Sequence, residues 1–329
     1  MKLNRRNQKS FYDIDLKTKI AGQHILWEIE KIISFSSLIY RLKDLESRLG
    51  RKGYGAEVGL RCMYLQFHYD LSDRQVEERL NFDLAFKWFC GFTAFEETPD
   101  HSYFCRFRKL VGTKRIGKIF KTIVNRSKKA GILRSIFHFV DATAIISKNT
   151  TWSERDKALK EGEEALNNTH IEKYSADKDA RCGCKGKSKF WFGYKGHAGM
   201  DMSSNLIESI VATPANISDQ DGFQHICPKD GQMTFGDKSY CLKPAQLAMK
   251  AKGAISAAIL KHNMKAKNKD LDRWRSAVRA PHEGTFSKFK KRARYRGLAK
   301  VQFQLFMDAI VWNVKRLVQI NPPPLIAGA

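Results

Sequence analysis

The pattern of apolar residues changes at about Leu133, and the change divides the chain into two kinds of structure. Before it, stretches such as "TKIAGQHILWEIEKIISFSSLIYRLKDLESRL" repeat apolar residues at three- and four-residue spacing, with charges between them. That is the pattern of amphipathic helices. After it, "SIFHFVDATAII" is rich in β-branched and aromatic residues, which is typical of a buried strand. The sequence therefore predicts an all-helical region followed by a region built around a sheet.

The second region continues with two more predicted strands, at residues 190–201 and 206–215, joined by the turn "MSSN". A helix at 218–227, a short strand at "MTFGDKSY", a helix at 244–252 and a strand at 253–260 follow. The chain then finishes with a long helical region broken near "RYRG". Three consecutive strands followed by alternating helices and strands predict an α/β fold, a mixed sheet with helices on its faces.

We predict a helical N-terminal domain at 1–130, a sheet domain at 131–322 and a C-terminal tail at 323–329. Within the sheet domain, residues 149–188 are polar, charged and poor in aliphatic side chains, so we expect an exposed insertion. The insertion contains "CGC", with Cys182 and Cys184. A zinc site usually needs two separated pairs of ligands, so reduced thiols with a minor structural part are the preferred interpretation.

The charge of the chain predicts a polyanionic partner. Lys and Arg number 59 against 34 Asp and Glu, a net charge of +25, and residues 261–300 hold fourteen of these cations against three acidic residues. Basic groups that neutralise phosphates release condensed counterions, which favours nucleic acid. An anionic membrane is the alternative, but there is no separate basic amphipathic helix and no apolar run of the roughly 18 residues needed to span a bilayer. With no signal peptide either, we expect a cytoplasmic protein.

Three acidic residues stand out from this basic background. Asp141 interrupts an apolar strand, where a charge is costly unless it is paired or bound to metal. Asp237 follows "MTFG", at the end of a predicted strand, and active sites of open sheets collect at such ends. Glu283 comes just after Pro281, a residue suited to a first helical turn. Three carboxylates that converge could hold Mg2+, which prefers oxygen ligands, and paired cations promote phosphoryl displacement.

Each of these residues also has an ordinary interpretation. Asp141 could cap the end of a strand, Asp237 could be a turn aspartate, and Glu283 could be a solvated ion-pair partner. His197, in "GYKGH", could lie near the site, although a structural histidine is the preferred interpretation. The residues alone thus predict a nucleic-acid-binding α/β protein with a candidate metal site.

A family resemblance adds to this interpretation. The blocks "FVDATAI", "KFWFGYKGHAGMD", "VATPANISDQDGF", "GDKSYC" and "RAPHEGTFSKFKKRARYRGLAKVQFQ" resemble, in order, those of DDE transposases of bacterial insertion sequences. The closest resemblance is to the group usually called family five. The stretches "LSDRQVEERLNFDLAFKWFCGF" and "TPDHSYFCRFRKL" of this chain resemble the N-terminal domain of that group. It implies an RNase H-like catalytic domain with Asp141 on its first strand, Asp237 after its fourth and Glu283 on a later helix.

The resemblance also implies an activity. Asp141, Asp237 and Glu283 would be catalytic and would bind Mg2+, with Mn2+ as a substitute. Cleavage at the terminal inverted repeats of an insertion sequence would be followed by attack of the freed 3′-hydroxyl on target DNA. The implied partners are double-stranded DNA and a second copy of the chain, as a homodimer at the bacterial nucleoid. Two alternatives stay open, an RNase H-like nuclease that cuts without joining and an inactive DNA-binding derivative.

The basic residues around the glutamate follow the same resemblance. The family signature there is Tyr, Arg, Glu and Lys at fixed spacing, and Arg279, Glu283 and Lys290 fit it. Ser276 stands where the family has tyrosine, so any contact made by that tyrosine is absent here. We expect Arg279 and Lys290 to contact phosphates, with Lys238, next to the second aspartate, as a weaker candidate for the same task.

Overall fold

The computed structural model divides the chain into two compact units, residues 1–132 with 307–329, and residues 133–306. It describes residues 18, 20, 22, 24–45, 53–148, 157, 159–162, 168–186, 189–229, 231–287 and 291–320. The division after residue 132 lies close to the predicted boundary at 130, but the C-terminal part differs from the predicted domains. Residues 307–329 group with the helical unit and not with the sheet.

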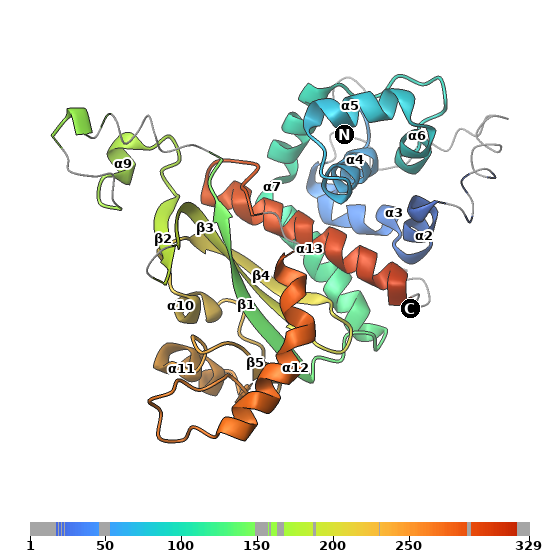
Figure 1. Ribbon diagram of the computed structural model, residues 1–329. Helices are drawn as coiled ribbons and strands as arrows, with labels where there is room; N and C mark the ends of the chain where they lie inside the picture. The colour runs from blue at the N-terminus through green and yellow to red at the C-terminus, as the bar shows by residue number, and fades with distance from the viewer. Residues whose placement is uncertain are drawn as a thin grey trace. The chain divides into compact units, whose positions relative to one another are not determined.

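The regular elements among the described residues of the first unit are all helices, as predicted (Figure 1). Its elements are α2 (Ile25–Ile32), α3 (Phe35–Leu38), the 3-10 helix η1 (Ile39–Leu45), α4 (Ala56–His68), α5 (Asp73–Phe82), α6 (Leu84–Cys90) and α7 (His101–Lys129). Polar side chains fix where these helices begin. Ser72 and Gln75 form a reciprocal capping box at α5, and Asp83 and Asp100 accept backbone N–H groups at the starts of α6 and α7, bonds that satisfy otherwise unpaired donors.

A buried arginine organises the core of this unit. Arg61, 1% exposed, donates to Glu57 (2.8 Å) and Glu30 (2.9 Å) and to the carbonyl of Phe89 (2.9 Å). Its guanidinium also lies 4.8 Å from the centroid of the Phe35 ring. A charge this deeply buried requires such partners, because an unpaired one would be strongly destabilising.

The second unit is built on a mixed sheet, which confirms the predicted fold class at this level. Its strands are β1 (Phe137–Ile146), β2 (Arg181–Lys185), β3 (Lys189–Asp201), β4 (Ile207–Pro214), β5 (Met233–Phe235) and β6 (Ile255–Ser256). The order is β2-β3-β1-β5-β6, and β4 pairs with β3 (Figure 1). The long strand β3 is antiparallel to β1, β2 and β4, whereas β5 is parallel to β1 and β6.

The predicted exposed insertion at 149–188 differs from what its described part shows. Strand β2 lies inside it and forms a hairpin with β3. Asp177, also inside it, is buried and accepts hydrogen bonds from Ser147 Oγ (3.0 Å), Tyr194 Oη (2.5 Å) and the Gly297 N–H (3.2 Å). A polar stretch can therefore be part of the folded unit, because its acidic side chain satisfies donors from three separate segments.

Helices cover both faces of the sheet. They are α10 (Asp219–Phe223), α11 (Lys243–Ala251) and α12 (Lys269–Ser287), and α13 (Leu298–Ile320) continues into the first unit, whereas α9 (Ile171–Tyr174) lies in the segment before β2. Val140 belongs to an apolar cluster with Phe223 of α10 and Met249 of α11. The preceding residue, Phe139, faces the other way, and its ring lies 6.0 Å from that of His282 on α12. Alternation along β1 thus separates the two covered faces.

Candidate active site

Strand pairing brings the two predicted aspartates together. Phe139 of β1 pairs in parallel with Phe235 of β5, and Asp141 and Asp237 each lie two residues beyond this pair. The chain stays extended past β5, since the N–H of Ile259 donates to the carbonyl of Gly236 (3.2 Å). Both aspartates therefore stand at the same level, on the side of the sheet where parallel strands end and ligands commonly bind.

The surroundings of Asp141 raise its affinity for a proton. Burial raises the pKa of its carboxyl to about 6, and the nearby charge of Asp237 adds to this effect, while Lys185 and Arg279 oppose it. The backbone N–H of Ala142 donates to its Oδ1 at 2.8 Å, which favours the charged form. Two neighbouring carboxylates that are partly desolvated favour either a shared proton or a cation.

Asp237 stabilises a turn through its hydrogen bonds and also lies next to Asp141 in the candidate site. Its Oδ1 accepts the N–H of Ser239 at 2.8 Å, and its carbonyl accepts the N–H of Tyr240 at 3.1 Å. Lys238, between them, is exposed. Tyr240 is buried, and its hydroxyl pKa lies well above the ordinary value because of that burial, with the charges of Asp141, Asp219 and Asp237 adding to it.

Glu283 lies elsewhere on its helix than expected. The prediction that Pro281 marks a helix start is wrong, because Asn268 caps α12 by accepting the N–H groups of Asp270 and Leu271 (3.0 Å each), and Pro281 lies inside the helix. Glu283 follows it towards the C-terminal end. Its side chain is 54% exposed and lies 3.1 Å from Nη2 of Arg279, one helical turn earlier.

Arg279 connects this glutamate to the aspartates. It is buried, and its guanidinium carbon lies 5.7 Å from the centroid of the Phe139 ring, two residues before Asp141. It is also close enough to Asp141 to lower the pKa of that carboxyl. Arg279, expected to contact phosphate, thus forms an ion pair with Glu283 and lies near Asp141 here. Its expected companion, Lys290, lies outside the described residues.

The three candidate carboxylates do not form one closed metal site among the described residues. Among the residues that the structure describes, no group of three or more His, Cys, Asp or Glu side chains is arranged to hold a metal ion. The structure brings Asp141 and Asp237 together but pairs Glu283 with Arg279. Two adjacent carboxylates fit a hard divalent cation that keeps several waters, and burial, which raises the pKa of Asp141, favours neutralisation of this pair by a proton or a cation.

His197 is a structural residue. It is fully buried, and its Nε2 lies 2.8 Å from the hydroxyl of Thr213 on β4. Burial lowers its pKa to about 4, so the ring is neutral near pH 7. Its packing against Gly222 leaves no room for a side chain at that position.

A basic cavity of about 330 Å³ next to Asp141 was not predicted from the sequence. Ala142, Thr143 and Ala144, which follow Asp141 on β1, line one part of it, and Lys185, Lys189 and Trp191 of the β2–β3 hairpin line another. The signal that could have found it is the alternation of Lys189, Trp191 and Lys195 on one face of β3. That signal has meaning only once β2 is recognised as a strand.

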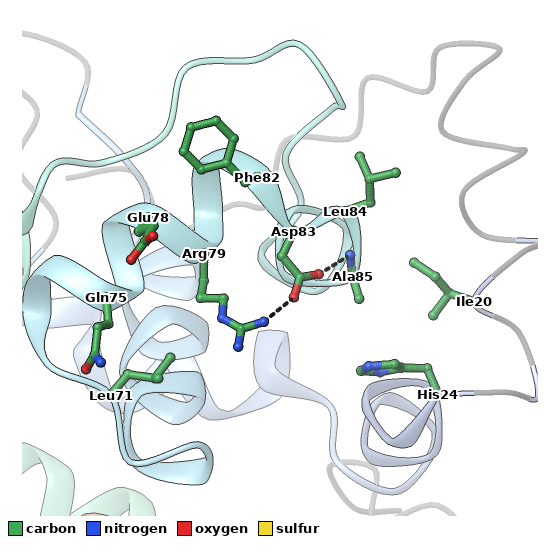
Figure 2. Close-up of a pocket in the computed structure, with 10 residues that line it drawn as sticks. All are labelled: Ile20, His24, Leu71, Gln75, Glu78, Arg79, Phe82, Asp83, Leu84 and Ala85. Carbon is green, nitrogen blue, oxygen red and sulfur yellow. Dashed lines mark hydrogen bonds and ion pairs between the residues drawn. The ribbon is translucent and has the colours of Figure 1, made fainter.

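A larger cavity, of about 880 Å³, lies in the helical unit (Figure 2). Figure 2 shows His24, Phe82 and Leu84 around it, with the Arg79–Asp83 ion pair (3.3 Å) at its side. Phe82 is 85% exposed. None of the carboxylates of the candidate active site contributes to this cavity.

Comparison with known proteins gives two matches to families. Residues 14–110 match a family described as "Transposase domain (DUF772)", and residues 165–314 match one described as "Transposase DDE domain". The second match includes Asp237 and Glu283, whereas Asp141 lies between the two matches. No helix in the described ranges has the length and apolar character to cross a membrane.

One solved structure, described as "Mos1 transposase paired-end complex with left transposon end", is 8% identical in sequence. The alignment covers 86% of this chain and 84% of that one, with a TM-score of 0.18. A score this low supports no inference about a shared architecture.

Proposed function

A DUF772 transposase domain and a transposase DDE domain together make up most of this chain, and from that premise we propose that it is a DDE transposase of a bacterial insertion sequence, close to the group called family five. It binds the terminal inverted repeats of its element, cuts the DNA at both ends and joins each 3′-hydroxyl to target DNA. The observation that carries this proposal is the level position of Asp141 and Asp237 on neighbouring parallel strands.

The catalytic unit adopts an RNase H-like fold under this proposal. The mixed sheet supports it, with β1 antiparallel to β3 and parallel to β5, and with helices on both faces. Asp141 lies on β1 and Asp237 just after β5. Strand β2 is additional to the four strands that the family layout places before the second aspartate.

Asp141 and Asp237 would hold Mg2+, or Mn2+ in its place, and Glu283 would be the third ligand. When bound, the cation supplies an activated water and stabilises charge on the attacking and leaving oxygens. Arg279 competes for Glu283, because the two side chains form an ion pair at 3.1 Å. This arginine therefore limits the negative charge of the site before DNA and metal are present.

Basic side chains next to the carboxylates would position the DNA. Lys238 is exposed beside Asp237, and Lys290 and Arg279 would contact phosphates near the scissile bond. Contacts of this kind set affinity and register without reading sequence. We further propose that two copies of the chain synapse the two element ends, and that the protein acts at the nucleoid.

Substitution of the aspartates tests the proposal. Asp141→Ala and Asp237→Ala each abolish cleavage of element-end DNA in Mg2+ while affinity for that DNA stays near the parental value, because phosphate contacts set affinity. Asp270→Ala is the matched control, since Asp270 is 90% exposed on the same unit. Cleavage at the parental rate by either active-site variant would refute the assignment. Cleavage without any joined product would instead indicate a nuclease.

A further inference from the structure

We propose that the basic cavity beside Asp141 binds one unpaired deoxynucleotide of the DNA strand that is being cut, with its base against Trp191 and its phosphates on the surrounding lysines. This inference deepens the proposed function and rests on it. It assigns a task to the β2–β3 hairpin and names a positioning residue, Trp191, outside the carboxylates.

The position of the cavity is the first argument. Ala142, Thr143 and Ala144 line it, and they follow Asp141 directly on β1. Lys185, on the opposite wall, is close enough to Asp141 to influence its carboxyl electrostatically. A nucleotide in this cavity would therefore lie beside Asp141, and its neighbour in the strand would lie at the carboxylates.

The chemistry of the walls is the second argument. Lys185, Lys189 and Lys291 are exposed at the cavity. A fourth, Lys195, is neutralised by Asp219, whose Oδ1 lies 2.9 Å from its Nζ. Of the four lysines in this lining, only Lys195 forms an ion pair with a carboxylate of the same lining. The cavity is therefore positively charged and suits a negatively charged ligand such as a phosphate group.

Trp191 is the third argument, because an aromatic ring can stack on a base and so favours a nucleotide over an anion that has no base. Its indole Nε1 donates to the carbonyl of Tyr194 at 3.1 Å, which fixes the orientation of the ring. Lys189 and Lys195 share its face of β3 by alternation, and Nζ of Lys195 lies 5.9 Å from the ring centroid. An aromatic ring set among cations is the usual platform on which single-stranded bases stack.

The size of the cavity decides between one base and a base pair. Its volume is about 330 Å³, at the lower end for small-ligand sites, and the side chains on β1 that form its wall are small. One nucleotide fits such a space, and a base pair does not. A base inside a duplex cannot present its face to an indole ring, so the bound nucleotide is unpaired.

Fluorescence tests this inference with a probe of defined chemistry. The probe is a short DNA duplex of the element end with a single-stranded tail that contains 2-aminopurine, whose emission is quenched by stacking. We expect the parental protein to quench the tail and to bind it more tightly than a blunt duplex. Trp191→Ala loses the quenching, and its preference for the tail falls about tenfold, within the range of stacking contacts. Trp191→Phe keeps part of both.

The same hairpin offers a control variant and a second test. Phe190 precedes Trp191, is 72% exposed and faces the other side of the strand, so Phe190→Ala should behave as the parent. Lys189→Ala removes an exposed charge without affecting the core and should make the salt dependence of tail binding shallower. A thermal unfolding curve of each variant shows that it is folded.

If Trp191→Ala binds and quenches the tail as Phe190→Ala does, the inference is overturned. Cleavage by the parent and by Asp141→Ala is measured in the same preparation. Equal cleavage by those two proteins would refute the proposed catalytic site, whereas a tail preference that depends on Trp191 would still support the nucleotide site.

Discussion

Replacing Asp141 with asparagine should stabilise the metal-free protein while removing the proposed cleavage activity. Asparagine keeps the shape of the side chain and can still accept the N–H of Ala142, which lies 2.8 Å from Oδ1 of the aspartate. It removes the negative charge that is partly desolvated and placed near Asp237. The change thus separates the electrostatic cost of the charge from the packing of the strand.

The size of the effect follows from the proton affinity. The pKa of Asp141 rises from an ordinary 3.8 to about 6 on folding, and each pKa unit corresponds to about 1.4 kcal/mol. The folded state thus binds this proton more tightly than the unfolded state. The resulting stabilisation is complete below about pH 4 and is lost as the pH rises through about 6. Above about pH 7, we expect Asp141→Asn to be more stable than the parent by about 1–3 kcal/mol.

The assay is urea or thermal unfolding between about pH 4 and pH 8, in the presence of a chelator. The parental free energy of unfolding should fall across this window relative to that of Asp141→Asn, and the two should converge at the acidic end. Addition of Mg2+ should stabilise the parent and leave the variant unchanged, because binding to the folded state alone adds stability. Asp270→Asn, at a position 90% exposed, serves as the control with no change expected.

Two results would refute this reasoning. If Asp141→Asn and the parent have the same unfolding free energy at every pH, the carboxylate of Asp141 is fully solvated. If the variant is less stable than the parent at about pH 8, the carboxylate makes favourable contacts that the described structure does not contain.

Three further predictions concern other parts of the chain. Arg61→Ala should lower the unfolding free energy by about 3–5 kcal/mol in denaturant titrations, because it leaves buried carboxylates without their partner; a loss under 1 kcal/mol would contradict the network. Gly59→Ala should cost about 1–3 kcal/mol in the same measurement, because a Cβ there would overlap the ring of Phe107, and overpacking is destabilising. In cleavage time courses, Glu283→Gln should lose activity yet bind DNA at least as well as the parent, whereas Lys290→Ala should bind DNA more weakly and keep metal-dependent cleavage; near-parental cleavage by Glu283→Gln would return that residue to a solvated ion pair.

The two aspartates could be singled out from the sequence by local patterns. A charge in the apolar stretch around Asp141 and a turn residue after a short strand at Asp237 are visible without any partner. Their adjacency depends on the pairing of β1 with β5. The residue pattern predicts that both are strands of a sheet, but it does not predict the order of the strands. Local patterns therefore located the residues, and the parallel register supplied the geometry.

Other features were missed because distant residues decide them. Pro281 has the signature of a helix start, but the cap at Asn268 begins α12 earlier. Strand β2 lies in a stretch with the composition of a loop, and its pairing with β3 comes from a hairpin that composition does not reveal. The cavity that contains Lys185 and Trp191 could not be predicted without that hairpin.

Helix α13 makes the completion of the helical unit depend on the last part of the chain to be synthesised. Residues 307–329 group with residues 1–132, although the whole sheet unit is encoded between them. Met307, Val314 and Leu317 are fully buried, and Nζ of Lys315 donates to the carbonyl of His68 at 3.1 Å. During translation, the interval between synthesis of residue 132 and synthesis of the C-terminal part of this unit is roughly ten to thirty-five seconds at common rates of synthesis. The residues of the sheet unit are all synthesised before that, so the helical unit, although it begins the chain, cannot complete its fold until the sheet unit has been made.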